Sequence, residues 1–266
     1  MPTPFDPGYV DEPFKSLCEQ APGESVYPSS AFRVEWGPLF HRGRLDGTAR
    51  LLILGQDPSH NEDIVRRILV GEAGRRTQGF MAKLGITRSY VMINTFLYGV
   101  VKQAAGNQHR HDAAIAAYRH RWLDALLVGT KVEAVVALGA LADGAWQMWK
   151  QTTRGQASTV AYAHITHPTQ PESSSGHNAS KLAAATQAML ANWNAALQSL
   201  KPAIQHPDHA ARVPYGTTFG PDDKPDIPAF DLPAGIPSWM GSEDGWATRG
   251  GVRARIEITV PADALP

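Results

Sequence analysis

Three polar side chains of complementary chemistry each follow a short apolar run of the sequence. They are Asp57, Asn94 and His167. A carboxylate can orient or activate water, a side-chain amide can read the donors and acceptors of a ligand, and an imidazole can donate a hydrogen bond to developing negative charge. Such a set could hydrolyse a bond whose leaving group departs as an anion, provided that the three side chains meet at one place.

The middle of the chain has the pattern needed to bring them together. The apolar runs that we expect as strands cover residues 49–54, 90–93, 132–138 and 161–165. The stretches that we expect as helices are 75–84, 115–126, 140–149 and 182–197. Strands that alternate with helices predict an α/β fold, a three-layer α/β/α sandwich with a central four-stranded parallel sheet. Because ligands bind at the carboxyl ends of parallel strands, the three polar side chains should lie in one crevice.

Each of the three residues also has an ordinary structural explanation. Asp57 stands in a Gly-X-Asp-Pro turn and could cap the next helix. Asn94 could be a turn residue, and His167, which precedes a proline, could cap or pack. Taken alone, Asn94 and His167 in particular are more often structural than functional. Their joint occurrence with Asp57 at successive strand ends favours a functional site.

Composition excludes several classes of protein. The 266 residues contain 43% hydrophobic residues, which is enough to bury a core and excludes wholesale disorder. Lys and Arg (25) balance Asp and Glu (25), so the chain is no polycationic coat for nucleic acid. The single cysteine, Cys18, cannot build a disulfide framework, a zinc knot or a four-cysteine iron–sulfur cluster. With no leader-like start and no long apolar window, we expect a cytoplasmic monomer that does not enter a membrane.

Proline sets the two ends of the chain apart from its middle. Residues 1–47 are rich in Pro, Gly and Ser and predict an irregular N-terminal arm packed on the core of a domain that spans 1–200. Residues 201–266 hold ten of the 20 prolines and predict a C-terminal extension with little helix. Alternating apolar residues within 253–260 predict a strand there. Four aromatic residues indicate that the extension packs on the core, namely Phe219, Phe230, Trp239 and Trp246.

The motifs around the polar residues resemble those of the uracil-DNA glycosylase superfamily. The run Gly55-Gln56-Asp57-Pro58-Ser59-His60 matches five of the six positions of the water-activating motif Gly-Gln-Asp-Pro-Tyr-His of the best-known family. His167-Pro168 is similar to the start of a second motif, His-Pro-Ser-Pro, and Asn94 sits where the superfamily carries its uracil-reading Asn. Residues 69–86 resemble the iron–sulfur branch instead, although the cysteines of that branch are missing. The resemblance covers roughly residues 49–200.

This resemblance implies a base-excision-repair enzyme that hydrolyses the N-glycosidic bond of deoxyuridine in DNA, releases free uracil and leaves an abasic site. The target base would be flipped out of the duplex or lie in a single strand, and neither a cofactor nor a metal is expected. Asp57 would orient the attacking water, His167 would donate to uracil O2, and Asn94 would read O4 and N3–H. The other residues expected to bind the substrate are Gly55, Gln56, Pro58, Ser59, His60 and Leu69.

Two segments are candidates for phosphate contacts. Basic residues outnumber acidic ones between residues 64 and 90, which favours either a phosphate-binding surface or a solvated helix face. The Ser-rich stretch after the second motif resembles the superfamily's loop that enters the minor groove. The residues expected to bind DNA are Arg66, Arg67, Arg75, Arg76, Ser173, Ser174, Ser175 and His177.

Departures from the family pattern leave the substrate open. Ser59 replaces the Tyr that blocks the thymine methyl group, and Leu69 or Val70 stands where a stacking Phe is expected. One alternative is therefore a glycosylase for hypoxanthine or mismatched thymine, and another is a nucleoside hydrolase. A third is a protein that binds or crosslinks uracil-containing DNA, because one branch has an Arg/His loop near the position of residues 106–111. We expect an exposed loop there, with no metal bound by His109 and His111.

Overall fold

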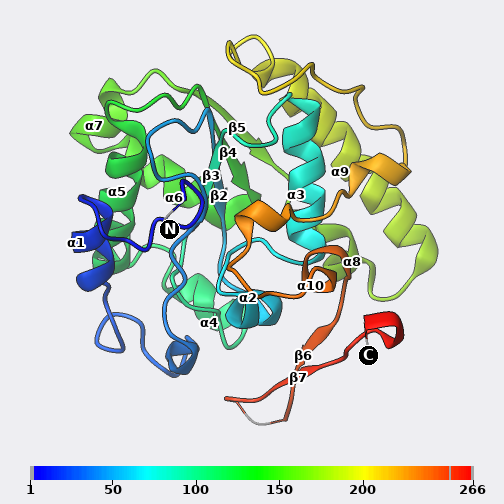
Figure 1. Cartoon of the computed structure of the whole chain (residues 1–266), viewed down its shortest axis with the longest axis horizontal. Coiled ribbons are helices and arrows are strands. Elements are labelled where there is room, and N and C mark those ends of the chain that lie inside the picture. The colour runs from blue at the N-terminus through cyan, green and yellow to red at the C-terminus, as the bar shows by residue number, and fades with distance from the viewer. Residues whose placement is uncertain (1–2, 252, 265–266) are drawn as a thin grey trace.

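A five-stranded sheet forms the centre of the computed structural model, which describes residues 3–251 and 253–264 (Figure 1). The strands lie in the order β1-β3-β2-β4-β5. The four strands from β2 to β5 are parallel, whereas β1 is antiparallel to β3. Their bounds are β1 (Arg42–Gly43), β2 (Leu51–Gly55), β3 (Tyr90–Asn94), β4 (Ala134–Leu138) and β5 (Ala161–Ile165).

The edge strand β1 corrects the prediction of a four-stranded parallel sheet. It is two residues long and lies in the segment for which composition predicts irregular structure. Arg42 pairs with Met92, and Gly43 pairs with Val91. Gly43 has a φ of +95°, and a Cβ at this position would lie 2.4 Å from the Tyr90 carbonyl oxygen, so only glycine fits here against β3. Two residues are too few to show an alternating pattern, which is why this strand has no signal in the sequence.

Helices cover both faces of the sheet because the strand side chains alternate between two apolar clusters. Leu52 and Leu54 of β2 pack with residues of α5 and α6, whereas Leu51 and Ile53 pack with residues of α3 and α9. Figure 1 shows these helices on opposite sides of the strands. Their bounds are α3 (Glu72–Lys83), α5 (Ala113–Leu127), α6 (Gly139–Lys150) and α9 (Ala179–Leu200). Burial of both sheet faces explains why the strands read as nearly continuous apolar runs.

Shorter helices fill the connections, and side chains cap several helix starts. Asp112 accepts hydrogen bonds from the backbone N–H groups of Ala114 and Ile115 at the start of α5, and Asn178 accepts from the N–H of Lys181 at the start of α9. The short helices are α1 (Phe14–Glu19), α2 (His60–Val65), α4 (Gln103–Gln108), α7 (Thr153–Ala157), α8 (Gln170–Ser175) and α10 (Trp239–Ser242). Single 3₁₀ turns cover Val34–Trp36, Pro221–Asp223, Ala229–Asp231 and Ala262–Ala264. None of the helices within the described residues is long and apolar enough to cross a membrane.

The C-terminal segment runs back across the core and ends in a hairpin beside α2. The hairpin strands are β6 (Ala247–Arg249) and β7 (Ile256–Ile258), and the second of them lies where alternation predicts a strand. Trp246 and Ala247 are buried with Val65 and Val70. In Figure 1 the hairpin extends below α2, at the same end of the molecule as α4. Since α2 and α4 follow β2 and β3, the hairpin lies at the carboxyl ends of the strands.

The other aromatic residues of this segment also contact neighbours. Phe219 packs edge-on against Trp193 of α9, with 6.3 Å between the ring centres, and Trp239 packs edge-on against Trp246. Phe230 remains 38% exposed, although its ring lies 4.7 Å from that of Phe5 in the N-terminal segment.

Candidate functional site

The first two candidate residues lie where β2 and β3 end level with each other. Gly55, the last residue of β2, is directly opposite Asn94, the last residue of β3. The two segments stay paired beyond this point. The N–H of Thr95 donates to the Gly55 carbonyl oxygen at 2.9 Å, and the N–H of Phe96 donates to the Gln56 carbonyl oxygen at 2.9 Å. The predicted strand ends are therefore bonded to each other through the backbone.

The side-chain amide of Asn94 lies directly over Gly55. A Cβ at residue 55 would lie 2.2 Å from Asn94 Oδ1, which is inside the closest permitted approach. Asn94 is only 7% exposed, and its Nδ2 group is buried without a hydrogen-bond partner among the described residues. An unpaired buried donor is costly, so its presence suits a ligand that supplies an acceptor.

Replacing Gly55 by Ala is expected to displace the Asn94 amide and to lower the rate of the reaction proposed below by about 10- to 100-fold, because small misplacements of reacting groups have effects of this size. The backbone at Gly55 has no positive φ, so alanine can be accommodated there without backbone strain. The matched control is Gly144→Ala in α6, where a Cβ meets no atom within 4 Å. That variant should keep its activity and become more stable by about 0.5–1 kcal/mol. A fully active Gly55→Ala protein would show that the Asn94 amide has no role.

A second glycine brings Gln56 and His167 together. Gly139 directly follows the third predicted strand, has a φ of +82° and begins α6. A Cβ on this residue would lie 2.8 Å from Gln56 Nε2 and 3.1 Å from the Cβ of His167. The segment Gly55–Gln56 therefore contacts Asn94 on one side and approaches His167 on the other, with Asp57 following directly. The three predicted polar residues thus lie at one edge of the sheet.

The local hydrogen bonds fix the protonation of His167. The backbone N–H of Thr169 donates to His167 Nδ1 at 3.3 Å, so Nδ1 acts as an acceptor, and the Thr169 hydroxyl lies 3.2 Å from the same nitrogen. Burial lowers the pKa of His167 to about 4. At neutral pH the ring is therefore uncharged and carries its proton on Nε2, which leaves an N–H donor for a ligand.

The carboxyl group of Asp57 is held through one oxygen. The backbone N–H of Val100 donates to Asp57 Oδ2 at 3.0 Å, whereas no described residue donates a hydrogen bond to Oδ1. Burial raises the pKa of Asp57 to about 6. The hydrogen bond from the Val100 N–H and the positive charge of Arg249 lower this pKa, but their effect is smaller than that of burial. Asp57 can thus be ionised near neutral pH, with one oxygen free to bind water.

The rest of the first motif and Leu69 are held in place by Glu62 of α2. Its side chain accepts hydrogen bonds from the backbone N–H groups of Ser59 and Leu69. Burial raises the pKa of Glu62 to about 8. Leu69 itself has a φ of +53° and packs within an apolar cluster of the core. His60 is the first residue of α2, with Ser59 as its N-cap, and burial lowers its pKa.

Phe80 is the first aromatic residue after Leu69 in the sequence, but its ring lies in the core. Phe80, on α3, is completely buried and packs edge-on against Trp193, with 5.6 Å between the ring centres. Its ring belongs to the core between α3 and α9 and is not available to a base.

The expectation of a basic surface between residues 64 and 90 does not hold for Arg67 and Arg76, which are 8% and 5% exposed. Arg67 pairs with Asp6 at 2.9 Å. Arg76 donates to the Pro168 carbonyl oxygen and pairs with Glu172 at 2.7 Å, so it supports the second motif from inside.

Arg66 and Arg75 lie nearer the surface but also bind the protein itself. Arg66 donates to the carbonyl oxygens of Trp36 and Pro38 at 2.7 and 2.8 Å. Arg75 pairs with Asp226 and Asp244 of the C-terminal segment. A charge count along the sequence could not reveal these partners, which are far away in the chain.

The Ser-rich stretch after the second motif is helical. Residues 170–175 form α8, and the hydroxyl groups of its serines donate to carbonyl oxygens within the same helix. Ser173 and Ser174 are exposed, Ser175 is buried, and His177 is exposed with a φ of +65°. The segment 106–111 is partly helical as well, because it overlaps the end of α4. His109 packs beside the ring of Phe32, at 5.3 Å.

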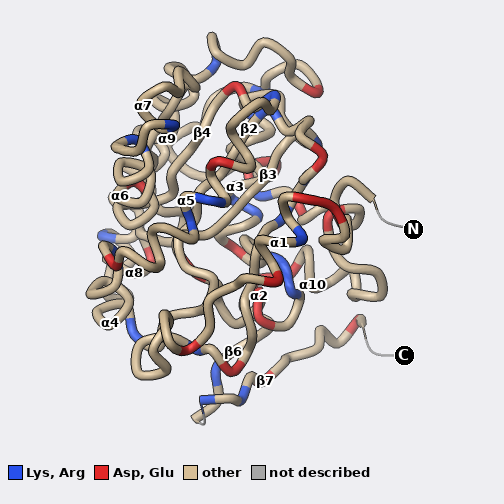
Figure 2. Tube along the Cα trace, turned by 90° about the vertical axis from the view of Figure 1, so that its left-hand side faces the viewer, with Lys and Arg blue, Asp and Glu red and all other residues tan. Residues whose placement is uncertain are grey.

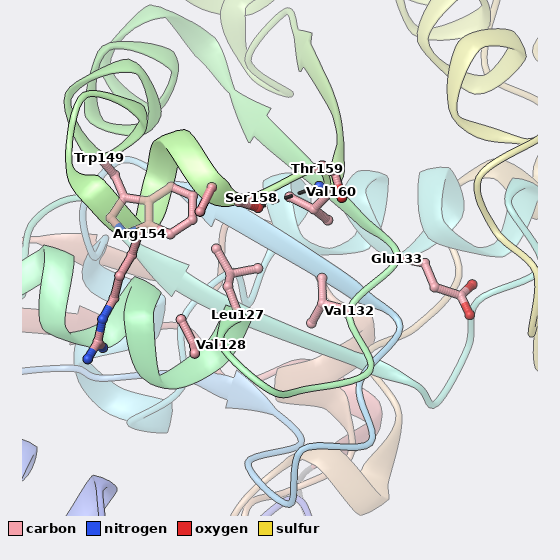
Figure 3. A pocket seen from close by; sticks show the side chains of 10 residues that line it. Leu127, Val128, Val132, Glu133, Trp149, Arg154, Ser158, Thr159 and Val160 are labelled. Carbon is pink, nitrogen blue, oxygen red and sulfur yellow. Dashed lines mark hydrogen bonds between the residues drawn. The ribbon is translucent and has the colours of Figure 1, made fainter.

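A surface hollow of about 540 Å³ lies at the opposite end of the sheet (Figure 3). Its lining residues precede β4 and β5 or belong to α5, α6 and α7, so they gather at the amino ends of those strands. Its one carboxylate, Glu133, points away from Trp149 and Arg154 in Figure 3 and pairs with Arg50. None of the candidate residues lines this hollow.

Comparison with known proteins agrees with the motifs. The model of the uracil DNA glycosylase superfamily matches residues 42–202, while a search of curated proteins gave no significant match. The matched span is more than half of the chain and contains all five strands of the central sheet together with Asp57, Asn94 and His167. The chain therefore belongs to the uracil DNA glycosylase superfamily.

Proposed function

We propose that the protein hydrolyses the N-glycosidic bond of deoxyuridine in DNA, releasing uracil and leaving an abasic site. Superfamily membership indicates a DNA glycosylase of base excision repair, and uracil as the target base is our proposal. The observation that carries it is the position of the segment Gly55–Asp57 between the amide of Asn94 and the imidazole of His167. This arrangement supports the proposal, because a carboxylate suited to hold water, an amide suited to read a base and an N–H donor lie around one strand end.

The chemistry places opposite demands on the two sides of the broken bond. The sugar becomes positively charged and the base leaves as an anion, so each needs its own electrostatic partner. The ionised Asp57 suits the sugar, because its free oxygen can hold the attacking water and face the positive charge. The uncharged His167 suits the base, because its Nε2–H can donate to uracil O2 without needing a proton from solution.

Base selection is assigned to Asn94. Its unpaired Nδ2 group can donate to O4 of uracil, and its Oδ1 can accept from N3–H. Cytosine offers an amino group and a bare N3 at these positions, so both contacts would be lost and the buried amide would stay unpaired. Ser59, at the exposed start of α2, is too small to block a thymine methyl group. The same site is therefore also compatible with mismatched thymine or hypoxanthine as the target base.

The rate of base release should depend on the ionisation of Asp57. Because its pKa is raised to about 6, the active ionised form is lost as the pH falls through this value. We expect the single-turnover rate to be level near neutral pH and to fall about tenfold per pH unit below about pH 6. His167, with a pKa of about 4, stays neutral over this range and adds no second transition. A profile that is flat down to about pH 5 would contradict the assigned role of Asp57.

The function itself is tested with oligonucleotides that carry one modified base. The protein is incubated with uracil in single-stranded DNA, uracil opposite guanine, thymine opposite guanine, or hypoxanthine, and each sample is then treated with alkali. Cleavage of the uracil strands after alkali supports the proposal. If only the thymine or the hypoxanthine strand is cleaved, the protein is a glycosylase for that base and not for uracil. A complex that survives denaturant would indicate crosslinking. A protein that releases no base and forms no such complex would overturn the proposal.

A further inference from the structure

Three carboxyl groups lie close together at the start of α2 and the residues before it. They belong to Asp57, Glu62 and Asp63, and burial raises the pKa values to about 6, 8 and 6. The negative charge of Asp63 raises the pKa of Asp57 further, and both acids raise that of Glu62. Such a cluster resists the ionisation that the proposed reaction requires of Asp57, unless a positive charge lies beside it.

The positive charge beside this cluster comes from the C-terminal hairpin. Arg249, the last residue of β6, places its Nη1 atom 3.4 Å from Asp63 Oδ2. Its Nη2 atom lies 3.2 Å from the position that a Cβ on Gly99 would take. Gly99 precedes Val100, whose N–H holds Asp57 Oδ2. The guanidinium group thus packs on the turn that holds the Asp57 carboxylate.

This turn has little freedom to move away from Arg249. A Cβ at Gly99 would lie 2.6 Å from the carbonyl oxygen of Pro58, so the turn already packs tightly against the residue that follows Asp57. On its other side, the backbone N–H of Arg33 donates to the Gly99 carbonyl oxygen at 2.8 Å. The Gly99–Val100 turn is therefore enclosed by the first motif, the N-terminal segment and the hairpin.

Several contacts hold the hairpin in this position. Trp246 and Ala247 anchor its base in the apolar cluster with Val65 of α2. At its tip, Arg253 pairs with Glu35 at 2.8 Å, and its carbonyl oxygen accepts a hydrogen bond from Arg33 at 3.2 Å. Figure 2 shows the basic positions of the hairpin at the same end of the molecule as α2. The hairpin lies outside the span that the family model matches.

We propose that Arg249 is a positioning residue for Asp57, which holds the Gly99–Val100 turn in place and supplies the positive charge that keeps the Asp57 carboxylate ionised. The proposal rests on the function proposed above. It gives the C-terminal segment an indirect part in that reaction, because Arg249 lies beyond residue 202, where the match to the family model ends. Arg249 acts through Asp57 and the turn and need not touch the base.

The charged and titratable groups around Asp57 come from three elements. From α2 these are Glu62, Asp63 and the first residue, His60. From β6 there is Arg249, from the end of α2 Arg66, whose charge acts on Asp63, and from the N-terminal segment Arg33, whose charge acts on Asp63 and Arg249. Arg249 is the cation among them that lowers the pKa of Asp57, so its removal should leave the carboxyl cluster without its principal counter-charge.

The test compares Arg249→Gln and Arg249→Lys in single-turnover assays across the pH range. In the Gln variant we expect the acid limb of the pH–rate profile to shift to higher pH by about one unit. The rate should then be about tenfold lower than that of the wild-type protein on the acid limb, and lower by under about threefold at alkaline pH. The Lys variant, which keeps the charge, should restore most of the limb. The control is Arg255→Gln on the same hairpin, where the arginine is exposed and pairs with Glu257. That variant should behave like the wild-type protein.

A second measurement does not depend on activity. Titration of the Asp57 carboxyl carbon by NMR, assigned with Asp57→Asn, should show a higher pKa in Arg249→Gln than in the wild-type protein. If the wild-type protein releases no base, the proposed function fails, while this titration still decides the role of Arg249. An unchanged acid limb and an unchanged titration would overturn the proposal. The proposal would also be overturned if Arg249→Gln bound DNA more weakly while the acid limb of its pH profile stayed unchanged. Together with a salt dependence of binding reduced by about one charge, that result would show that Arg249 contacts a phosphate.

Discussion

Replacing Asp57 by Asn is expected to slow single-turnover release of uracil by roughly 100- to 10,000-fold, the range typical of a lost general base. The amide keeps the size of the side chain, so the packing of the motif is preserved. It cannot carry the negative charge that faces the sugar cation, and it is a far weaker acceptor of a proton from water. The measurement is the rate of alkali-sensitive strand formation with enzyme in excess over a uracil-containing oligonucleotide.

The stability of this variant separates a chemical effect from a structural one. Burial raises the pKa of Asp57 above that of an unfolded chain, so the folded state binds its proton more tightly. The associated stabilisation is complete at low pH and is lost as the pH rises through about 6, which means that the ionised group opposes folding at neutral pH. The uncharged Asp57→Asn variant should therefore melt at the same temperature as the wild-type protein, or higher, when both are measured at neutral pH.

The matched control is Asp112→Asn, because it makes the same chemical change at a carboxylate whose role is to cap a helix. Asp112 caps α5, and asparagine is an equally good cap, so both stability and activity should stay close to the wild-type values. An Asp57→Asn protein that releases uracil as fast as this control would remove Asp57 from the mechanism. If Asp57→Asn is slow and also melts at a lower temperature than the wild-type protein, the location of the site stands, but the carboxylate has a structural role.

The elements that position the site could be predicted because their signals are local. Strands β2 to β5 are buried on both faces and so appear as short apolar runs, and helices α3, α5, α6 and α9 have one apolar face. The edge strand β1 has no such signal. It exists because Gly43 allows close approach to β3 and because a distant carboxylate, Asp231, accepts a hydrogen bond from the Gly43 N–H at 2.9 Å.

The placement of Asp57, Asn94 and His167 at one sheet edge follows from parallel strand topology, which the alternation of strands and helices predicts. The groups that tune these side chains could not be found in the same way. Val100 acts through its backbone N–H, and Gly139 acts through its lack of a side chain. Arg249 acts through a contact with Asp63, which is 186 residues away in the sequence. Only Gly139 has a local sign, as the glycine that directly follows the apolar run of β4.

The same limit explains the arginines between residues 64 and 90. Their number favours a surface for phosphates, yet the carbonyl oxygen and the carboxylate that bind Arg76 lie 92 and 96 residues away in the sequence. Sequence composition counts charges but does not pair them. The structure pairs Arg76 with the segment of the second motif, Arg75 with the C-terminal segment and Arg67 with the N-terminal segment.

Loss of the Asp231 carboxylate is expected to be the most destabilising single change in the C-terminal segment. Asp231 is 1% exposed and accepts hydrogen bonds from the Gly43 N–H at 2.9 Å and from the Tyr90 hydroxyl at 2.6 Å. Its Oδ2 also lies 3.6 Å from Nε of Arg42, which is fully buried. Asp231→Ala would leave two donors and a buried guanidinium charge without this partner. We expect a loss of about 3–5 kcal/mol in the free energy of unfolding, measured by denaturant titration.

Two further variants show whether the buried charge is the cause. Asp226→Ala, on the same segment, removes a mostly exposed partner of Arg75 and should cost at most about 1 kcal/mol. Combining Arg42→Met with Asp231→Leu removes both charges, and it should recover much of the stability lost in Asp231→Ala, because an apolar pair can replace a buried ion pair. If Asp231→Ala is no less stable than Asp226→Ala, the buried pair does not anchor the segment. If the double variant is as unstable as Asp231→Ala, the loss comes from the hydrogen bonds of Gly43 and Tyr90 and not from the charge of Arg42.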